Sequence, residues 1–313
     1  MNISNLQSNI TQGSTQTGLN LEILRMTILT PNLICFLCFL YVIVIILKVY
    51  FTTPHVQENG RYVLFAHMLI SDLIYLTTAI TLLLFSMYSV AFPVSICYVM
   101  VTASSSSFKV TPYILAVMSL ERYVAICFPL RYAEFCTRRK SGIAVAVVWL
   151  VGLIPNIADF IMLSSSVNVN FFLTYVHCAR TSLLNTAEQN TLRSFIHAMT
   201  FTLVGLIIVF TYVKIMVVAL KIDSGKSSAS KASKTVMLHA VQLLLCMTAF
   251  TYPITEMYLR NYIIMLPILN FSLFMCLPRF ISPLIYGIRD DVFRDCIRRY
   301  VLCKPVRIHV NAI

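Results

Sequence analysis

The chain of 313 residues is too apolar for a soluble protein, because 58% of its residues are hydrophobic and only 12% are charged. Soluble domains carry about 25% charged residues, so a water-facing surface would lack polar cover here. The formal net charge is +12. Its basic residues are distributed by loop, however, and form no face interleaved with exposed aromatics, which disfavours a nucleic-acid-binding protein. We therefore expect lipid to be the solvent.

Seven stretches are long and apolar enough to cross a bilayer, which takes roughly 20 residues. They cover 23–49, 62–88, 95–127, 141–163, 193–221, 234–258 and 261–286. The sequence predicts an all-α membrane protein with a seven-transmembrane helix bundle at 23–289, an N-terminal tail at 1–22, and a short amphipathic helix and cytoplasmic tail at 290–313. No pair of broken apolar segments recurs in two halves, which disfavours an inverted-repeat transporter.

The distribution of basic residues predicts the orientation in the membrane. Most lysines and arginines lie in alternate loops and in the C-terminal tail, and this side is therefore cytoplasmic. The N-terminus is then extracellular, and the expected location is the plasma membrane. Asn2 and Asn9 each begin a glycosylation sequon in the external tail, so we expect both to be glycosylated.

Two of the ten cysteines face the oxidising side of the membrane. Cys97 begins the third helix and Cys178 lies in the second outer loop, so we predict a disulfide that pins this loop over the bundle mouth. In the amphipathic segment after the seventh helix, Cys296 and Cys303 are candidates for palmitoylation. Most other cysteines lie in apolar helices and are interpreted as small buried hydrophobes.

The third helix ends with Met118-Ser-Leu-Glu-Arg-Tyr-Val-Ala-Ile-Cys127. A single arginine at a helix end is ordinarily an anchor that reaches toward the lipid headgroups. Arg122, however, follows Glu121, which can pair with it, and the five donors of a guanidinium can turn to another partner when helices separate.

Further motifs accompany this block at compatible spacings. They are Asp72, Pro129-Leu-Arg-Tyr132, Trp149, Lys231-Ala-Ser-Lys-Thr235 with His239, and Pro283-Leu-Ile-Tyr-Gly-Ile-Arg289. The ordered set resembles rhodopsin-like G-protein-coupled receptors, and within them the odorant (olfactory) receptors of the fish type. The sequence departs from the family pattern by lacking an asparagine at 41–47, by Ser282 before Pro283, and by a single cysteine in the second outer loop.

The resemblance implies a receptor that binds a small-molecule odorant in the outer half of the bundle. It would then activate a heterotrimeric G protein of the stimulatory olfactory type and raise cyclic AMP. By family alignment the activation switch and G-protein coupling involve Glu121, Arg122, Tyr123, Tyr212, His239, Ser282, Pro283 and Tyr286. The ligand pocket would contain Ser104, Ser105, Phe108, Lys109, His197, Thr200, Phe250, Thr251, Ile254, Ser272 and Met275.

Two ionisable residues lie deep in apolar segments, where charge is costly and usually functional. Asp72 is near mid-membrane, and the family alignment places Thr111 and Ser282 beside it, forming a hydroxyl cluster able to hold water or a sodium ion. A neutral, hydrogen-bonded structural aspartate is the alternative. Lys109 needs a partner, which is either Asp159 or Glu256 within the protein or a carboxylate of the ligand.

Other functions find less support in the sequence. A receptor for an internal ligand, such as a peptide or a lipid, remains the alternative to an odorant receptor. An aminergic receptor would have an aspartate where this chain has Ser104, and a retinal protein needs a lysine that 261–286 lacks. There is no metal-ligand cluster, nucleophile–base pair or phosphate-binding loop in the sequence, so neither an enzyme nor a cofactor is predicted.

Overall fold

A computed structural model describes residues 3–178, 183, 187–222, 241, 244, 271–281, 283 and 294. Within these ranges the chain is almost entirely helical. The elements are α1 (Ile3–Thr52), α2 (Pro54–Glu58), α3 (Gly60–Met87), β1 (Ala91–Pro93), α4 (Val94–Cys127), α5 (Pro129–Phe135), α6 (Arg138–Ser166), η1 (Val169–Leu173), β2 (Tyr175–His177), α7 (Ala187–Ile222) and the π-helical turn η4 (Phe271–Cys276).

Five helices are long and apolar enough to cross a membrane. Their spans are Leu29–Thr52, Gly60–Met87, Val94–Cys127, Arg138–Ser166 and Thr191–Val218. They correspond to the first five predicted segments: the first span begins six residues later than predicted, and the other four agree within three residues at each end. A shorter apolar helix, Phe271–Ile281, lies within the predicted seventh segment. The predicted sixth segment and the amphipathic helix at 290–313 lie outside the described residues, except for single positions.

The first helix is longer than its membrane span. The sequence predicts a helix from residue 23, whereas α1 begins at Ile3. Nothing before Pro31 excludes a helix, because residues 3–30 contain no proline to remove a backbone donor. The segment predicted as an external tail is therefore helical from Ile3, and the predicted glycosylation at Asn9 falls within this helix.

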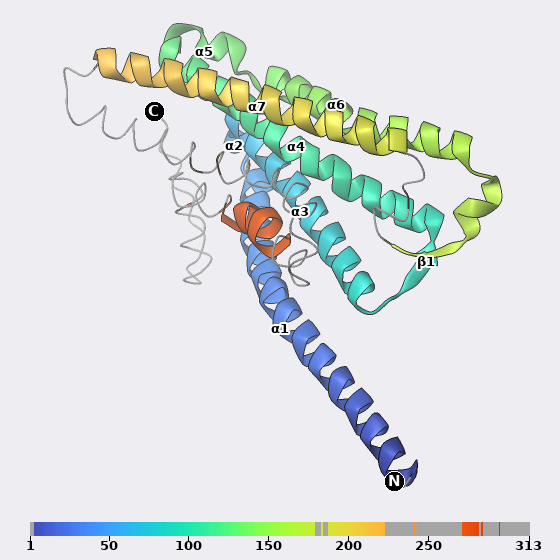
Figure 1. Ribbon diagram of the computed structural model, residues 1–313. Coiled ribbons are helices and arrows are strands. Elements are labelled where there is room, and N and C mark those ends of the chain that lie inside the picture. Colours follow the sequence, from blue (N-terminus) through green and yellow to red (C-terminus); the bar gives the residue numbers. More distant parts are fainter. Residues whose placement is uncertain are drawn as a thin grey trace.

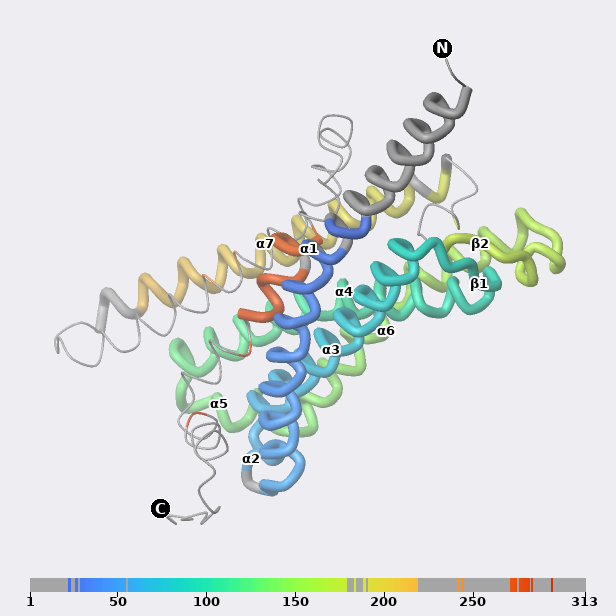
Figure 2. Tube along the Cα trace, turned by 90° about the horizontal axis from the view of Figure 1, so that it is seen from below, coloured from blue at the N-terminus to red at the C-terminus, as the bar shows by residue number. Residues whose placement is uncertain are grey.

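Helix α4 is central to the arrangement and packs against α3, α6 and α7 (Figure 1). The main hydrophobic core joins these helices to α1 through large, fully buried side chains. Examples are Ile43, Phe65, Met68, Leu115 and Met118. Figures 1 and 2 both show η4 beside α1. The ring of Phe280, which follows η4, meets the ring of Phe39 of α1 edge to face, with 5.4 Å between the ring centres. Many large apolar side chains point outward, as expected where lipid replaces water.

Two glycines allow helices to approach closely. A Cβ atom on Gly152 of α6 would lie 3.0 Å from a methyl group of Val110 in α4. A Cβ atom on Gly60, at the start of α3, would overlap the Ser141 hydroxyl and lie 2.9 Å from the Cys136 carbonyl oxygen. Small residues at such points bring backbones together, which is how helices associate in membranes.

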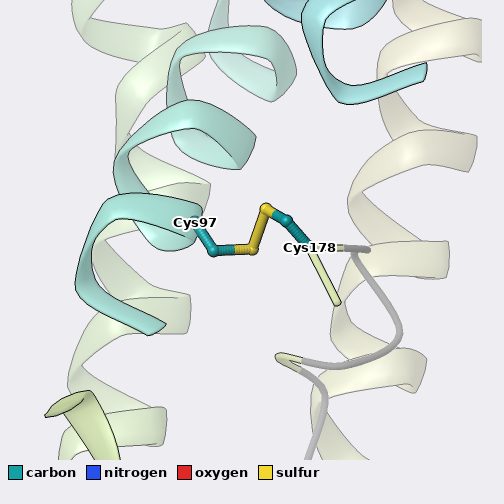
Figure 3. The surroundings of a disulfide bond; sticks show 2 residues. All are labelled: Cys97 and Cys178. Carbon is teal, nitrogen blue, oxygen red and sulfur yellow. A yellow bond between two sulfur atoms is a disulfide. The ribbon is translucent and has the colours of Figure 1, made fainter. Parts of the chain in front are cut away.

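A small sheet and a disulfide lie at the N-terminal end of α4. Strands β1 and β2 pair antiparallel, with Phe92 opposite Val176. The predicted bond between Cys97 and Cys178 is confirmed and joins the first turn of α4 to the loop after β2 (Figure 3). Both cysteines are buried in a second apolar cluster with Val94 and Leu183. The loop is thereby attached to the mouth of the bundle.

Candidate functional site

The C-terminal end of α4 carries a cluster of charged and phenolic groups. The Arg122 Nε atom lies 3.6 Å from Glu121 Oε2. The Tyr132 hydroxyl of α5 donates a 2.6 Å hydrogen bond to Glu121 Oε1. The buried Glu121 carboxylate therefore contacts Arg122 of α4 through one oxygen and Tyr132 of α5 through the other. Tyr132 was not among the predicted site residues, although it belongs to the quoted Pro129–Tyr132 motif.

Two groups beside this carboxylate have raised pKa values. Burial raises the pKa of the Tyr132 phenol, and the hydrogen bond to Glu121 raises it further. Burial also raises the pKa of the Cys136 thiol, with a smaller contribution from the Glu121 charge. Both groups therefore stay protonated at neutral pH, and Tyr132 remains a hydrogen-bond donor to Glu121.

Tyr123, the third residue of the predicted switch motif, connects α4 to α7. Its ring lies 5.7 Å from that of Phe128 and 5.8 Å from that of Phe210, both edge to face. Tyr212, also predicted as a switch residue, is partly exposed on α7. The contact with Phe210 thus joins the last turns of α4 to α7.

A buried ion pair occupies the middle of the bundle. Asp72 of α3 is fully buried, and its Oδ1 atom accepts hydrogen bonds from Thr111 Oγ1 at 2.7 Å and from Arg279 Nε at 3.0 Å. The predicted neighbour Thr111 is thus in place, and Ser71 Oγ lies 3.1 Å from its hydroxyl. The other predicted neighbour, Ser282, is outside the described residues.

Arg279 was missed by the sequence analysis. It follows η4, is only 4% exposed, and its guanidinium carbon lies 3.9 Å from the centre of the Tyr75 ring and 5.1 Å from that of Phe108. The signal was available, because an arginine within a segment expected to span the membrane is rare and needs a partner. The identity of that partner depends on how two distant helices pack.

The residues around Asp72 do not fit the predicted sodium ion. Hard cations are held by several oxygen atoms at once, but a guanidinium already lies against this carboxylate, and the hydroxyls of Ser71 and Thr111 are engaged in hydrogen bonds. A sodium ion would have to share one negative charge with Arg279. Arg279 thus lies beside the carboxylate at which the sequence suggested water or a sodium ion.

Several predicted pocket residues lie together between α4 and α7. The rings of Phe108 and His197 are nearly parallel, with centres 6.3 Å apart. The hydroxyl of Thr200 lies 2.7 Å from that of Tyr113, which the sequence analysis did not single out. Phe108 also contacts Tyr75 of α3, at 5.8 Å. An aromatic group with a few hydroxyls at its edge suits a small, mostly apolar molecule.

One suggested partner of Lys109 is already paired. Asp159 Oδ2 accepts a 2.6 Å hydrogen bond from Arg193 Nε, and this ion pair joins α6 to α7. The expectation that Asp159 pairs with Lys109 is therefore not met. The physical reason is that Arg193, near the start of the α7 span, lies within hydrogen-bond distance of this carboxylate. Lys109 is itself buried, and Glu256 lies outside the described residues.

Ser272, predicted as a pocket residue, contacts the first helix. Its hydroxyl accepts a 2.9 Å hydrogen bond from Asn32 Nδ2 of α1. A π-helical turn changes the direction of its side chains relative to an α-helix, so alignment alone does not give the orientation of this serine. The pocket residues Ser104 and Ser105 are half-buried on α4.

Other predicted residues are outside the described part of the chain, or their side chains are. They are Asn2, Asn9, His239, Phe250, Thr251, Ile254, Met275, Ser282, Tyr286, Cys296 and Cys303. Pro283 is described and buried. Among the described residues, no three or more histidine, cysteine or acidic side chains are grouped so that they could hold a metal ion.

Comparison with known proteins identifies the family. Residues 40–286 match the family described as 7 transmembrane receptor (rhodopsin family). Odorant receptor 131-2 of Danio rerio is 30% identical over 251 residues, which cover 79% of this chain and 77% of that protein. The chain belongs to the odorant receptors of the rhodopsin family. It is accordingly a multi-pass membrane protein, and its family consists of signalling receptors and is not an enzyme class.

Human odorant receptors are similar over a shorter region. Olfactory receptor 6K3 of Homo sapiens is 29% identical, and the match covers 62% of this chain and 59% of that receptor. Olfactory receptor 6Y1 of Homo sapiens is 26% identical, with coverage of 63% and 62%. The chain therefore spans about six tenths of the length of these two relatives.

Proposed function

We propose that this odorant receptor binds a small molecule between the outer halves of α3, α4 and α7 and activates a heterotrimeric G protein at its cytoplasmic face. The observation that carries the proposal is the group formed by Phe108, His197, Thr200 and Tyr113, which joins α4 to α7 inside the bundle. Aromatic faces supply contact area to an odorant, and the hydroxyl pair supplies orientation.

The same aromatic group touches the buried ion pair. Phe108 lies against His197 on one side and near the Arg279 guanidinium on the other. A ligand that displaces the Phe108 ring changes the surroundings of Arg279, and through it those of Asp72. We infer that this contact carries the effect of binding toward α3 and the segment that follows η4, because packed groups with two arrangements can transmit coupling.

At the cytoplasmic end, the cluster of Glu121, Arg122 and Tyr132 holds the resting state. Contacts to Glu121 keep Arg122 within the receptor and keep α5 against α4. Separation of the helices would release the guanidinium, whose donors then engage a partner. The proposed partner is a G protein of the stimulatory olfactory type, and the proposed output is a rise in cyclic AMP at the plasma membrane, with the N-terminus outside.

The test measures cyclic AMP in cells that express the chain with the stimulatory olfactory G protein. The cells receive a panel of amino acids, bile acids, carboxylates and amines. We expect at least one class to raise cyclic AMP, and Arg122→Ala to abolish the response at equal surface expression. Silence of the surface-delivered receptor toward every class, together with a response to a peptide or lipid, would favour the internal-ligand alternative.

A matched pair of threonine variants localises the pocket. Thr200→Val removes the hydroxyl that meets Tyr113, whereas Thr211→Val on the same helix removes a hydroxyl that donates to the backbone carbonyls of Ile207 and Ile208 one turn earlier. A net hydrogen bond contributes about 0.5–1.5 kcal/mol, so Thr200→Val should shift the half-maximal ligand concentration about 2–12-fold. Equal shifts in the two variants would remove Thr200 from the ligand site.

A further inference from the structure

The buried carboxylate of Asp72 must have its charge balanced, because an isolated charge in the membrane interior is strongly unfavourable. A proton, a mobile cation and a cation of the protein are the three available means. The structure provides a cation of the protein, Arg279. Arg279 Nε lies 3.0 Å from Asp72 Oδ1, with the two side chains 5% and 0% exposed.

The guanidinium is held in place by more than this one bond. Its carbon lies 3.9 Å from the centre of the Tyr75 ring, on the same helix as Asp72 and about one turn away. Phe108 of α4 approaches it from another helix, at 5.1 Å. Aromatic faces attract a cation most strongly where water is excluded. The charge is therefore fixed by contacts from α3 and α4.

A mobile cation would have to compete with this fixed one. Asp72 Oδ2 is buried and has no hydrogen-bond partner among the described residues, so it is the acceptor that remains. A sodium ion at Oδ2 would lie on the order of 5–6 Å from the guanidinium, and repulsion at an effective dielectric constant of about 20 would weaken its binding roughly a hundredfold.

We propose that Arg279 is the built-in counter-ion of Asp72 and replaces the sodium ion that this carboxylate would otherwise attract. Arg279 thus joins the segment after η4 to α3 by an ion pair, and to α4 through Phe108, without depending on the ionic composition of the medium. It is a positioning residue for the polar core and has no contact with the G protein. The inference goes beyond the proposed function and does not depend on the ligand.

Thermal unfolding of the purified full-length receptor tests this assignment. Melting temperatures are compared in sodium chloride and in choline chloride at equal ionic strength. We expect the unchanged receptor to melt at the same temperature in both salts. In Arg279→Gln, where the carboxylate is released, sodium should raise the melting temperature by about 2–4 °C, and the added Asp72→Asn change should abolish this gain.

A double-mutant comparison in choline chloride keeps the proposal testable if sodium binds weakly. Arg279→Gln and Asp72→Asn should each lower the melting temperature, by on the order of 10 °C, because each leaves one buried charge of the pair without its partner. The double variant should melt above Arg279→Gln, because it buries no unpaired charge. Sodium stabilisation of the unchanged receptor that is lost in Asp72→Asn would overturn the proposal, as would additive effects of the two substitutions.

Discussion

Replacing Tyr132 by phenylalanine removes one hydroxyl from the cluster of Glu121, Arg122 and Tyr132 and leaves the aromatic ring. The lost contact is the 2.6 Å hydrogen bond to Glu121 Oε1. Hydrogen bonds to charged groups contribute about 1.5–3 kcal/mol, and we take about 1–2 kcal/mol because Tyr132 is only partly buried and water replaces some of the loss. If this bond forms only in the resting state, its loss raises the active fraction about 5–30-fold.

The assay is basal cyclic AMP in cells that express Tyr132→Phe with the stimulatory olfactory G protein, corrected for surface expression. Tyr175→Phe serves as a control, because Tyr175 lies on the outer strand β2 and is 72% exposed. We expect Tyr132→Phe to raise basal signalling and Tyr175→Phe to leave it at the level of the unchanged receptor. Basal signalling of Tyr132→Phe equal to that of the unchanged receptor would refute the role of this bond in holding the resting state.

Three other outcomes follow from the geometry; melting temperature and alkylation are measured on the purified receptor, and surface delivery is measured in expressing cells. Gly60→Ala should destabilise it by about 1–3 kcal/mol, because the new Cβ would press on the Cys136 carbonyl, whereas Gly142→Ala meets nothing within 4 Å and should not; equal melting temperatures would contradict the close approach. Serine in place of either cysteine of the disulfide should cost about 4–5 kcal/mol for a separation of 81 residues, and surface delivery should fall; normal delivery would count against the bond. The raised pKa of Cys136 lowers its thiolate fraction at neutral pH, so its alkylation should be slow at pH 7, accelerate only above the ordinary thiol range, and be faster in Glu121→Gln; a rate unaffected by Glu121→Gln would refute the electrostatic contribution.

Features that depend on segment length and composition were predictable from the sequence. The first five spans are set by runs of apolar residues, and the structure places each within six residues of the prediction. The bond between Cys97 and Cys178 followed from the predicted topology, because both residues were expected on the oxidising side. The helical extension of α1 to Ile3 was missed, since polar residues carry no membrane signal.

Partners within the bundle were harder to predict, because they depend on the rotation of helices far apart in sequence. Arg279 was visible as a charge in an apolar segment, but its pairing with Asp72 across 207 positions was not. Similarly, Asp159 could face either α4 or α7, and it pairs with Arg193. The direction of Ser272 depends on the π-helical turn, which no simple periodicity reveals.

The central claim is that a small molecule acts through this chain on a G protein. Guanine-nucleotide exchange tests it most directly, with the purified receptor and the stimulatory olfactory G protein together in lipid bilayers. The compound used is the most effective member of the cyclic AMP panel. Our account predicts that this compound accelerates exchange on the unchanged receptor and leaves it unchanged with Arg122→Ala. Exchange that is independent of the compound, or equal in the two receptors, would contradict it.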